Sequence, residues 1–246
     1  ILSAVNLILS ALAWCFLESG EASPTKRVPP AFEFSQITQV IRLPDMWLVA
    51  TVVFCAYCAY WGTFAFASYA TEVFTFSILA GGALGVTKMW VKPLAAFGAG
   101  FAADLIGVSR GILLIFLVSA MSFSALALLS GDTSQLWMMI TLVIIASITV
   151  SSLRAIYFAL LEEVEIPLAL TGTAAGFASV IGFAPDVFMP LLMGYFLDNY
   201  QDGSGYRYYF ATITSICVLG AIAACLIIQR THIPTTDDSL AGRHVD

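Results

Sequence analysis

The sequence predicts an all-α membrane protein, a polytopic helical bundle. Its 246 residues are 60% hydrophobic and only 11% charged, and the mean hydropathy is +0.92. The apolar residues come in long blocks separated by short polar joints, which a water-soluble domain would not show. A helix needs about 20 residues to cross a hydrocarbon core of about 30 Å. Seven stretches are long and apolar enough to be transmembrane helices: 1–17, 46–70, 76–103, 111–129, 136–161, 168–197 and 208–228.

The first stretch, residues 1–17, starts inside an apolar run and without a Met, so we expect the chain to be a fragment of a longer protein. It lacks the basic leader and small-residue cleavage site of a signal peptide. Residues 18–45 are polar and proline-rich, as in a flexible linker. At the linker's end, Ser35 can cap a short amphipathic helix over 36–43, which Pro44 would stop. We expect this helix to lie on the cytoplasmic surface.

The distribution of basic residues predicts the orientation. Placing the linker in the cytoplasm leaves only Arg207 outside and two lysines in the bilayer. Seven basic residues then lie on or near the cytoplasmic side: Lys26, Arg27, Arg42, Arg110, Arg154, Arg230 and Arg243. The tail, residues 229–246, would also be cytoplasmic. The sequence thus predicts a multi-pass protein of a bacterial-type inner membrane or a plasma membrane. The net charge of −6 and the lack of a basic patch exclude nucleic acid as a predicted partner.

Lys88 and Lys92 stand one helical turn apart inside an apolar stretch. An ammonium group in hydrocarbon costs about 3 kcal/mol or more, so it needs a partner, a wet cavity or a ligand. Counting about 1.5 Å per residue places Lys92 about 18 Å and Lys88 about 24 Å from the cytoplasmic helix end. Asp186 lies at a similar depth, about 22 Å. Two interpretations stay open: a structural Lys88–Asp186 ion pair, or lysines that contact an anionic substrate or take part in ion coupling.

Prolines and aromatic residues mark the same helices. Pro93, Pro185 and Pro190 are expected to break two helices, and broken helices free backbone groups that bind ligands in transporters. The stretch 46–70 is rich in aromatic residues, of which Tyr57, Trp61 and Phe64 share one stripe. Such a stripe is typical of a core or lipid-facing surface.

A short motif follows the stretch 76–103 and recurs three helices later. Both copies read G-x-x-x-D, then Gly, then Arg: Gly100, Asp104, Gly107 and Arg110 in the first, Gly194, Asp198, Gly203 and Arg207 in the second. The two joints lie on opposite sides of the membrane, so the pattern predicts two inverted three-helix repeats. The first copy is expected to form a latch. Gly100 would allow close helix approach, Asp104 would pair with an Arg or a helix N-terminus, and Gly107 would make the turn.

Arg154, near a helix end, has two open interpretations. Its side chain can extend to the cytoplasmic surface, or it can join the latch by pairing with Asp104, Glu162 or Glu163. The three glutamates Glu162, Glu163 and Glu165 otherwise read as a solvated loop.

The residues Gly100, Asp104, Gly107 and Arg110 resemble the loop motif of the major facilitator superfamily, in the copy that joins helices eight and nine. The usual second basic residue is replaced here by Gly111. The resemblance implies that residues 1–17 end a truncated N-terminal half. It makes residues 18–45 the central cytoplasmic loop and residues 46–228 the six-helix C-terminal half.

The resemblance further implies a secondary active transporter that works by alternating access, with the missing N-terminal half as its partner. A small solute, expected to be an organic anion, would bind at the two intramembrane cations, Lys88 and Lys92. It would also contact Tyr57, Tyr60 and Trp61, because these residues lie in the stretch that corresponds to helix seven of the family, which borders the cavity. Coupling to protons through Asp186 is a further hypothesis.

A seven-helix receptor or another non-transport membrane protein is the alternative. Against a retinal protein, the stretch 208–228 contains no lysine for a Schiff base. Cys55 and Cys58 form a lone C-x-x-C without a second pair or a nearby His, which signals neither zinc nor redox chemistry. We therefore predict no enzyme activity, no metal and no cofactor.

Overall fold

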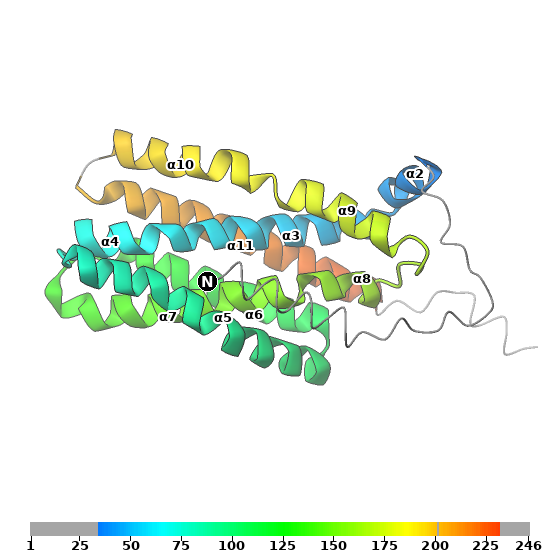
Figure 1. The fold of residues 1–246 in the computed structure, drawn as a ribbon, viewed down its shortest axis with the longest axis horizontal. Coiled ribbons are helices and arrows are strands. Elements are labelled where there is room, and N and C mark those ends of the chain that lie inside the picture. The colour runs from blue at the N-terminus through cyan, green and yellow to red at the C-terminus, as the bar shows by residue number, and fades with distance from the viewer. Residues whose placement is uncertain (1–33, 201, 232–246) are drawn as a thin grey trace, which may run out of the picture. The chain divides into compact units, whose positions relative to one another are not determined.

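A computed structural model describes residues 34–200 and 202–231, and every regular element within these ranges is helical (Figure 1). Six helical spans in them are long and apolar enough to cross a membrane: Pro44–Glu72, Ile78–Ile106, Val108–Leu128, Thr133–Glu163, Thr171–Asn199 and Ser204–Thr231. The all-α prediction is confirmed, and the six spans match six predicted stretches to within a few residues. The predicted stretch 1–17, most of the linker and the tail beyond residue 231 lie outside the described residues.

Several spans are built from more than one element. The first comprises α3 (Pro44–Gly62), a 3₁₀ turn (Thr63–Ala65) and α4 (Phe66–Glu72), whereas α5 (Ile78–Ile106) and α6 (Val108–Leu128) are single helices. The fourth comprises a 3₁₀ turn (Thr133–Gln135), α7 (Leu136–Ile156), a second turn (Tyr157–Ala159) and α8 (Leu160–Glu163). The last two are α9 (Thr171–Gly182) with α10 (Pro185–Asn199), and α11 (Ser204–Thr231). We call the end of the bundle where α3 begins the Asp45 end, and the opposite end the Val73 end.

The helix before the first span, α2 (Phe34–Arg42), is strongly amphipathic, as predicted. It begins at Phe34, so Ser35 lies in its first turn and not before its start. Val40 is fully buried, while Thr173 of α9 donates a 3.3 Å hydrogen bond to Gln36. Pro44 starts α3, which suits a residue without a backbone N–H. The location of α2 on a membrane surface stays a prediction.

Helix α3 packs against α9, α10 and α11, and one side of it is completely buried. Small residues permit this packing, because helices in a membrane associate largely through close van der Waals contact. A Cβ atom at Gly220 of α11 would come within 2.9 Å of the Cβ of Cys55 on α3. A Cβ at Gly182 of α9 would come within 2.3 Å of the Val53 side chain. Glycine therefore sets the spacing of both neighbours from α3.

The prolines act differently in the two helices. Pro185 begins α10 after a break from α9, as predicted. Pro190 lies inside α10, and Pro93 lies inside α5, which continues from Ile78 to Ile106. The predicted breaks at Pro93 and Pro190 are therefore wrong. An interior proline removes a single intrahelical hydrogen bond, for Pro93 the one to the carbonyl of Met89, and membrane helices tolerate this loss.

Replacing Gly220 with Ala should lower the thermal stability of the full-length protein in detergent. The new methyl group would come within 2.6 Å of the Phe116 ring, and such overpacking costs about 1–3 kcal/mol. The matched control is Gly176→Ala in α9, where a Cβ meets no described atom within 4 Å. Equal melting temperatures for the two variants would contradict the proposed spacing role.

Candidate functional site

Four aromatic residues form a stripe along the partly exposed side of α3 and the following turn: Tyr57, Tyr60, Trp61 and Phe64. Their spacing of three and four residues puts them on one helix face. Neighbouring rings touch, with centroids 5.7 Å apart for Tyr57 and Tyr60, 5.1 Å for Tyr60 and Phe64, and 4.9 Å for Trp61 and Phe64. The stripe is a continuous surface of ring faces and edges.

Lys88 of α5 is 8% exposed. Its Nζ lies 3.5 Å from the Phe64 ring centroid and 5.9 Å from that of Tyr60. A cation over an aromatic face gains about 0.5–1 kcal/mol at an exposed site and about 2 kcal/mol when desolvated. The aromatic faces therefore receive the ammonium group for which the sequence suggested Asp186 as a partner.

Lys92 and Arg154 approach the same stripe. The Nζ of Lys92 lies 5.6 Å from the Tyr60 centroid and 4.0 Å from the sulfur of Met89, and the side chain is partly exposed. The Arg154 guanidinium carbon lies 4.0 Å from the Tyr60 centroid and 5.4 Å from that of Tyr57. Three cations from α5 and α7 thus lie within 6 Å of one ring, Tyr60.

Asp186, in the first turn of α10, reaches the stripe with an exposed carboxylate. It accepts a 2.9 Å hydrogen bond from the indole N–H of Trp61 and a 3.2 Å bond from the hydroxyl of Tyr57. No ion pair joins Lys88 to Asp186 in the part of the chain that the structure describes. The expected direct pair is absent because each group has aromatic partners of its own, Lys88 at Phe64 and Asp186 at Trp61.

The joint between α5 and α6 lies at the Asp45 end. Gly107 has a φ of +90°, which favours glycine, so the predicted turn is confirmed. The carboxylate of Glu163 accepts a 2.7 Å hydrogen bond from the backbone N–H of Ser109 and a second bond from its hydroxyl. An acid suits the N-terminal turn of α6, where backbone N–H groups are unpaired. Glu163, which the sequence assigned to a solvated loop, therefore holds this joint.

Three latch expectations differ from the structure. Asp104 is exposed and forms no ion pair with another described residue. A Cβ at Gly100 would meet no described atom within 4 Å, so none of the described helices approaches closely there. Arg154 points to Tyr60 instead of the helix ends, so both of its predicted positions, at the surface and in the latch, are wrong. Arg110 is exposed at the second position after Val108 in α6.

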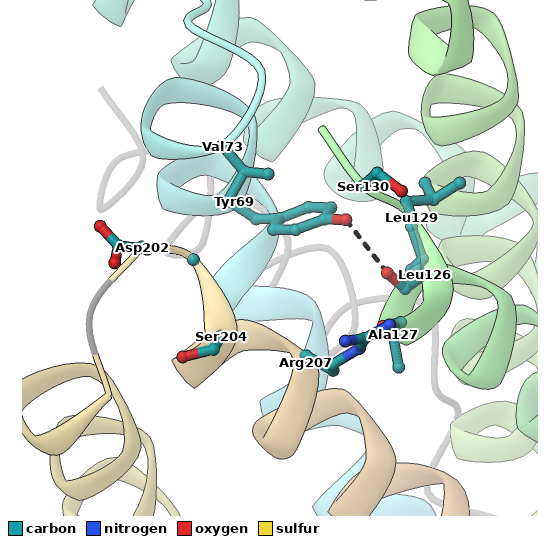
Figure 2. Close-up of a pocket in the computed structure, with 10 residues that line it drawn as sticks. Tyr69, Val73, Leu126, Ala127, Leu129, Ser130, Asp202, Ser204 and Arg207 are labelled. Carbon is teal, nitrogen blue, oxygen red and sulfur yellow. Dashed lines mark hydrogen bonds between the residues drawn. The ribbon is translucent and has the colours of Figure 1, made fainter. Parts of the chain in front are cut away.

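The second copy of the motif lies at the Val73 end, beside a pocket of about 240 Å³ (Figure 2). Gly203 has a φ of +78°, which matches the role of Gly107. Arg207 donates a 3.0 Å hydrogen bond through Nε to the carbonyl of Ala127, and Tyr69 donates to the carbonyl of Leu126 at 3.0 Å. Both carbonyls lie in the last turn of α6, where a cation is favourable.

The comparisons with known proteins agree with this architecture. Residues 49–243 match the Major Facilitator Superfamily. The chain belongs to this superfamily. Proteins of the superfamily are membrane transporters, and the resemblance carried by the loop motif is confirmed.

Two relatives come from Escherichia coli (strain K12). The chain is 24% identical over 248 aligned positions to inner membrane protein YqcE, covering 98% of this chain and 58% of the relative. It is 24% identical over 234 positions to inner membrane protein YihN, covering 93% of this chain and 56% of the relative. The chain therefore spans little more than half the length of either superfamily member.

Sequence reasoning missed two contributors to the cation cluster. Phe64 was assigned to the aromatic stripe but was not predicted to contact Lys88. Arg154 was placed too near the helix end. The depth estimates could have placed Arg154 near the lysines. The estimated depths of Lys92 and Arg154 differ by only about 8 Å, or some five residues at about 1.5 Å each. A long side chain directed inward spans much of that gap.

Replacing Glu163 with Ala should destabilise the joint between α5 and α6. The first turn of α6 would lose both bonds to Ser109, and the loss of such a cap costs about 1 kcal/mol. We expect a lower melting temperature for the full-length protein in detergent. Glu162→Ala is the control, because this neighbouring side chain is exposed and caps nothing in the described residues. A larger loss for Glu162→Ala would contradict the capping role.

Proposed function

We propose that this chain is the C-terminal half of a secondary transporter that moves a small organic anion across a membrane by alternating access. One observation carries the proposal. Lys88, Lys92 and Arg154 meet at Tyr60, and none of them forms an ion pair within the described ranges 34–200 and 202–231. Unpaired cations in the interior of a membrane protein mark substrate or ion pathways.

The three cations have different exposures, which suggests different roles. Lys88 is buried against Phe64, whereas Lys92 is partly exposed and has only weak partners, the Met89 sulfur and the Tyr60 ring. Lys92 is thus the better candidate for direct contact with the substrate. Tyr57, Tyr60 and Trp61 would supply ring faces, and their positions are supported by the bonds from Tyr57 and Trp61 to Asp186.

The relatives and the charge distribution support a location. Both relatives are named inner membrane proteins, and we extend this location to the present chain. We also keep the orientation in which α11 ends in the cytoplasm, which the excess of basic residues at the Asp45 end favours. In that orientation Glu163 and Gly107 form the cytoplasmic joint, and Arg207 lies at the outer one.

Lys92→Ala should abolish uptake of an anionic substrate by the full-length protein in proteoliposomes, without loss of expression. The reason is the removal of a partly exposed positive charge that has only weak partners among the described residues. A panel of labelled organic anions would identify a transported species, and Lys92→Ala would then be measured against Arg42→Ala. Arg42 is an exposed cation at the end of α2 and is not one of the three cations that contact Tyr60. Uptake by Lys92→Ala equal to that of Arg42→Ala would refute the proposed role.

Proton coupling through Asp186 stays a prediction with its own test. Asp186→Asn should retain exchange of internal for external substrate but lose accumulation driven by a pH gradient, because the amide cannot take up a proton. The amide oxygen still accepts the bond from Trp61. If accumulation persists in Asp186→Asn, the carboxylate acts only by positioning Tyr57 and Trp61.

A further inference from the structure

The charges inside the spans are few and can be counted. In the six described spans, four charged side chains lie away from the first and last turns: Lys88, Lys92, Arg154 and Asp186. All four contact the aromatic stripe. Counted by residue type, three basic side chains and one acidic side chain give the stripe a formal charge of +2.

An uncompensated charge inside a membrane costs several kcal/mol, and the described residues of the site lack two negative charges. A monoanion would leave one positive charge at the stripe, and a dianion would leave none. We infer that the substrate is a compact organic dianion, either a phosphate monoester or a short dicarboxylate. This inference rests on the proposed function, and it adds the charge and size of the transported molecule.

The geometry of the cluster supports a compact ligand. The three cations lie within 6 Å of the Tyr60 centroid, so they are grouped around one ring and are not spread along the bundle. Arg154 has a planar guanidinium that suits carboxylate and phosphate oxygens. Its Nε is buried and has no hydrogen-bond partner among the described residues. Such a donor is costly to leave unsatisfied, at about 1–3 kcal/mol.

Asp186 is the acidic residue of the site. Its carboxylate is held by Tyr57 and Trp61, whereas the Lys88 ammonium contacts Phe64. The acid therefore lowers the charge of the site without forming an ion pair with any cation in the described residues. None of the three cations is therefore neutralised by a carboxylate of the described residues.

The test is a binding measurement on the purified full-length protein by isothermal titration calorimetry at pH 8. Two matched pairs of probes are used, methyl phosphate against dimethyl phosphate and succinate against succinamate. At this pH a phosphate monoester is a dianion, because its second pKa is about 6. In at least one pair, the dianion should bind at least about tenfold more tightly than its monoanionic analogue, which corresponds to about 1.4 kcal/mol. The pair that responds separates phosphate from dicarboxylate.

Variants then connect the preference to the cluster. Lys92→Gln should bring the ratio of the two dissociation constants close to one, while Lys92→Arg, which keeps the charge, should preserve it. Arg42→Gln removes a charge outside the cluster and should leave the ratio unchanged. Two outcomes would overturn this inference without overturning the proposed function. One is equal affinity for the dianion and the monoanion of both pairs, and the other is an unchanged ratio in Lys92→Gln. If no organic anion binds in this assay or is taken up from the wider panel, both fail.

Discussion

The need to accommodate charge inside hydrocarbon dominates the central part of this molecule. Away from the first and last turns, the described spans contain three cations and one carboxylate, and the aromatic stripe contacts all of them. Aromatic rings suit this task because their faces attract cations, while indole N–H and phenol O–H groups bind the carboxylate. The stripe keeps opposite charges in the same site without neutralising them. The described residues of the site therefore keep an excess of positive charge.

The second organising feature is the capping of both ends of α6 by side chains from other helices. Glu163 binds its first turn, and Arg207 and Tyr69 bind carbonyls of its last turn. An acid at the N-terminus and a base at the C-terminus both complement the helix dipole. Since the caps come from α8, α11 and α4, they also fix the positions of three other elements. The bundle is thus tied together at both of its ends around α6.

The sequence predicted much of the candidate site, but not its contacts. Lys88 and Lys92 were identified from their cost in a membrane, and Tyr57, Tyr60 and Trp61 from the resemblance. The direct Lys88–Asp186 pair was wrong, because depth along a helix says nothing about which side the side chain faces. Which glycines lie in close helix contacts was likewise decided by the packing. Gly81 is in close contact with Thr71, whereas Gly82 and Gly176 face open space among the described atoms.

By itself, the sequence determined that the chain crosses a membrane several times, where its described helices lie, and to which superfamily it belongs. These properties follow from local composition, because a hydrocarbon core requires long apolar helices and a turn at Gly107 requires a residue that tolerates positive φ. Only the tertiary structure decided that Arg154 joins the lysines and that Glu163, in place of Asp104, holds the joint. Long charged side chains reach several partners from one backbone position, and the packing of the helices selects among them.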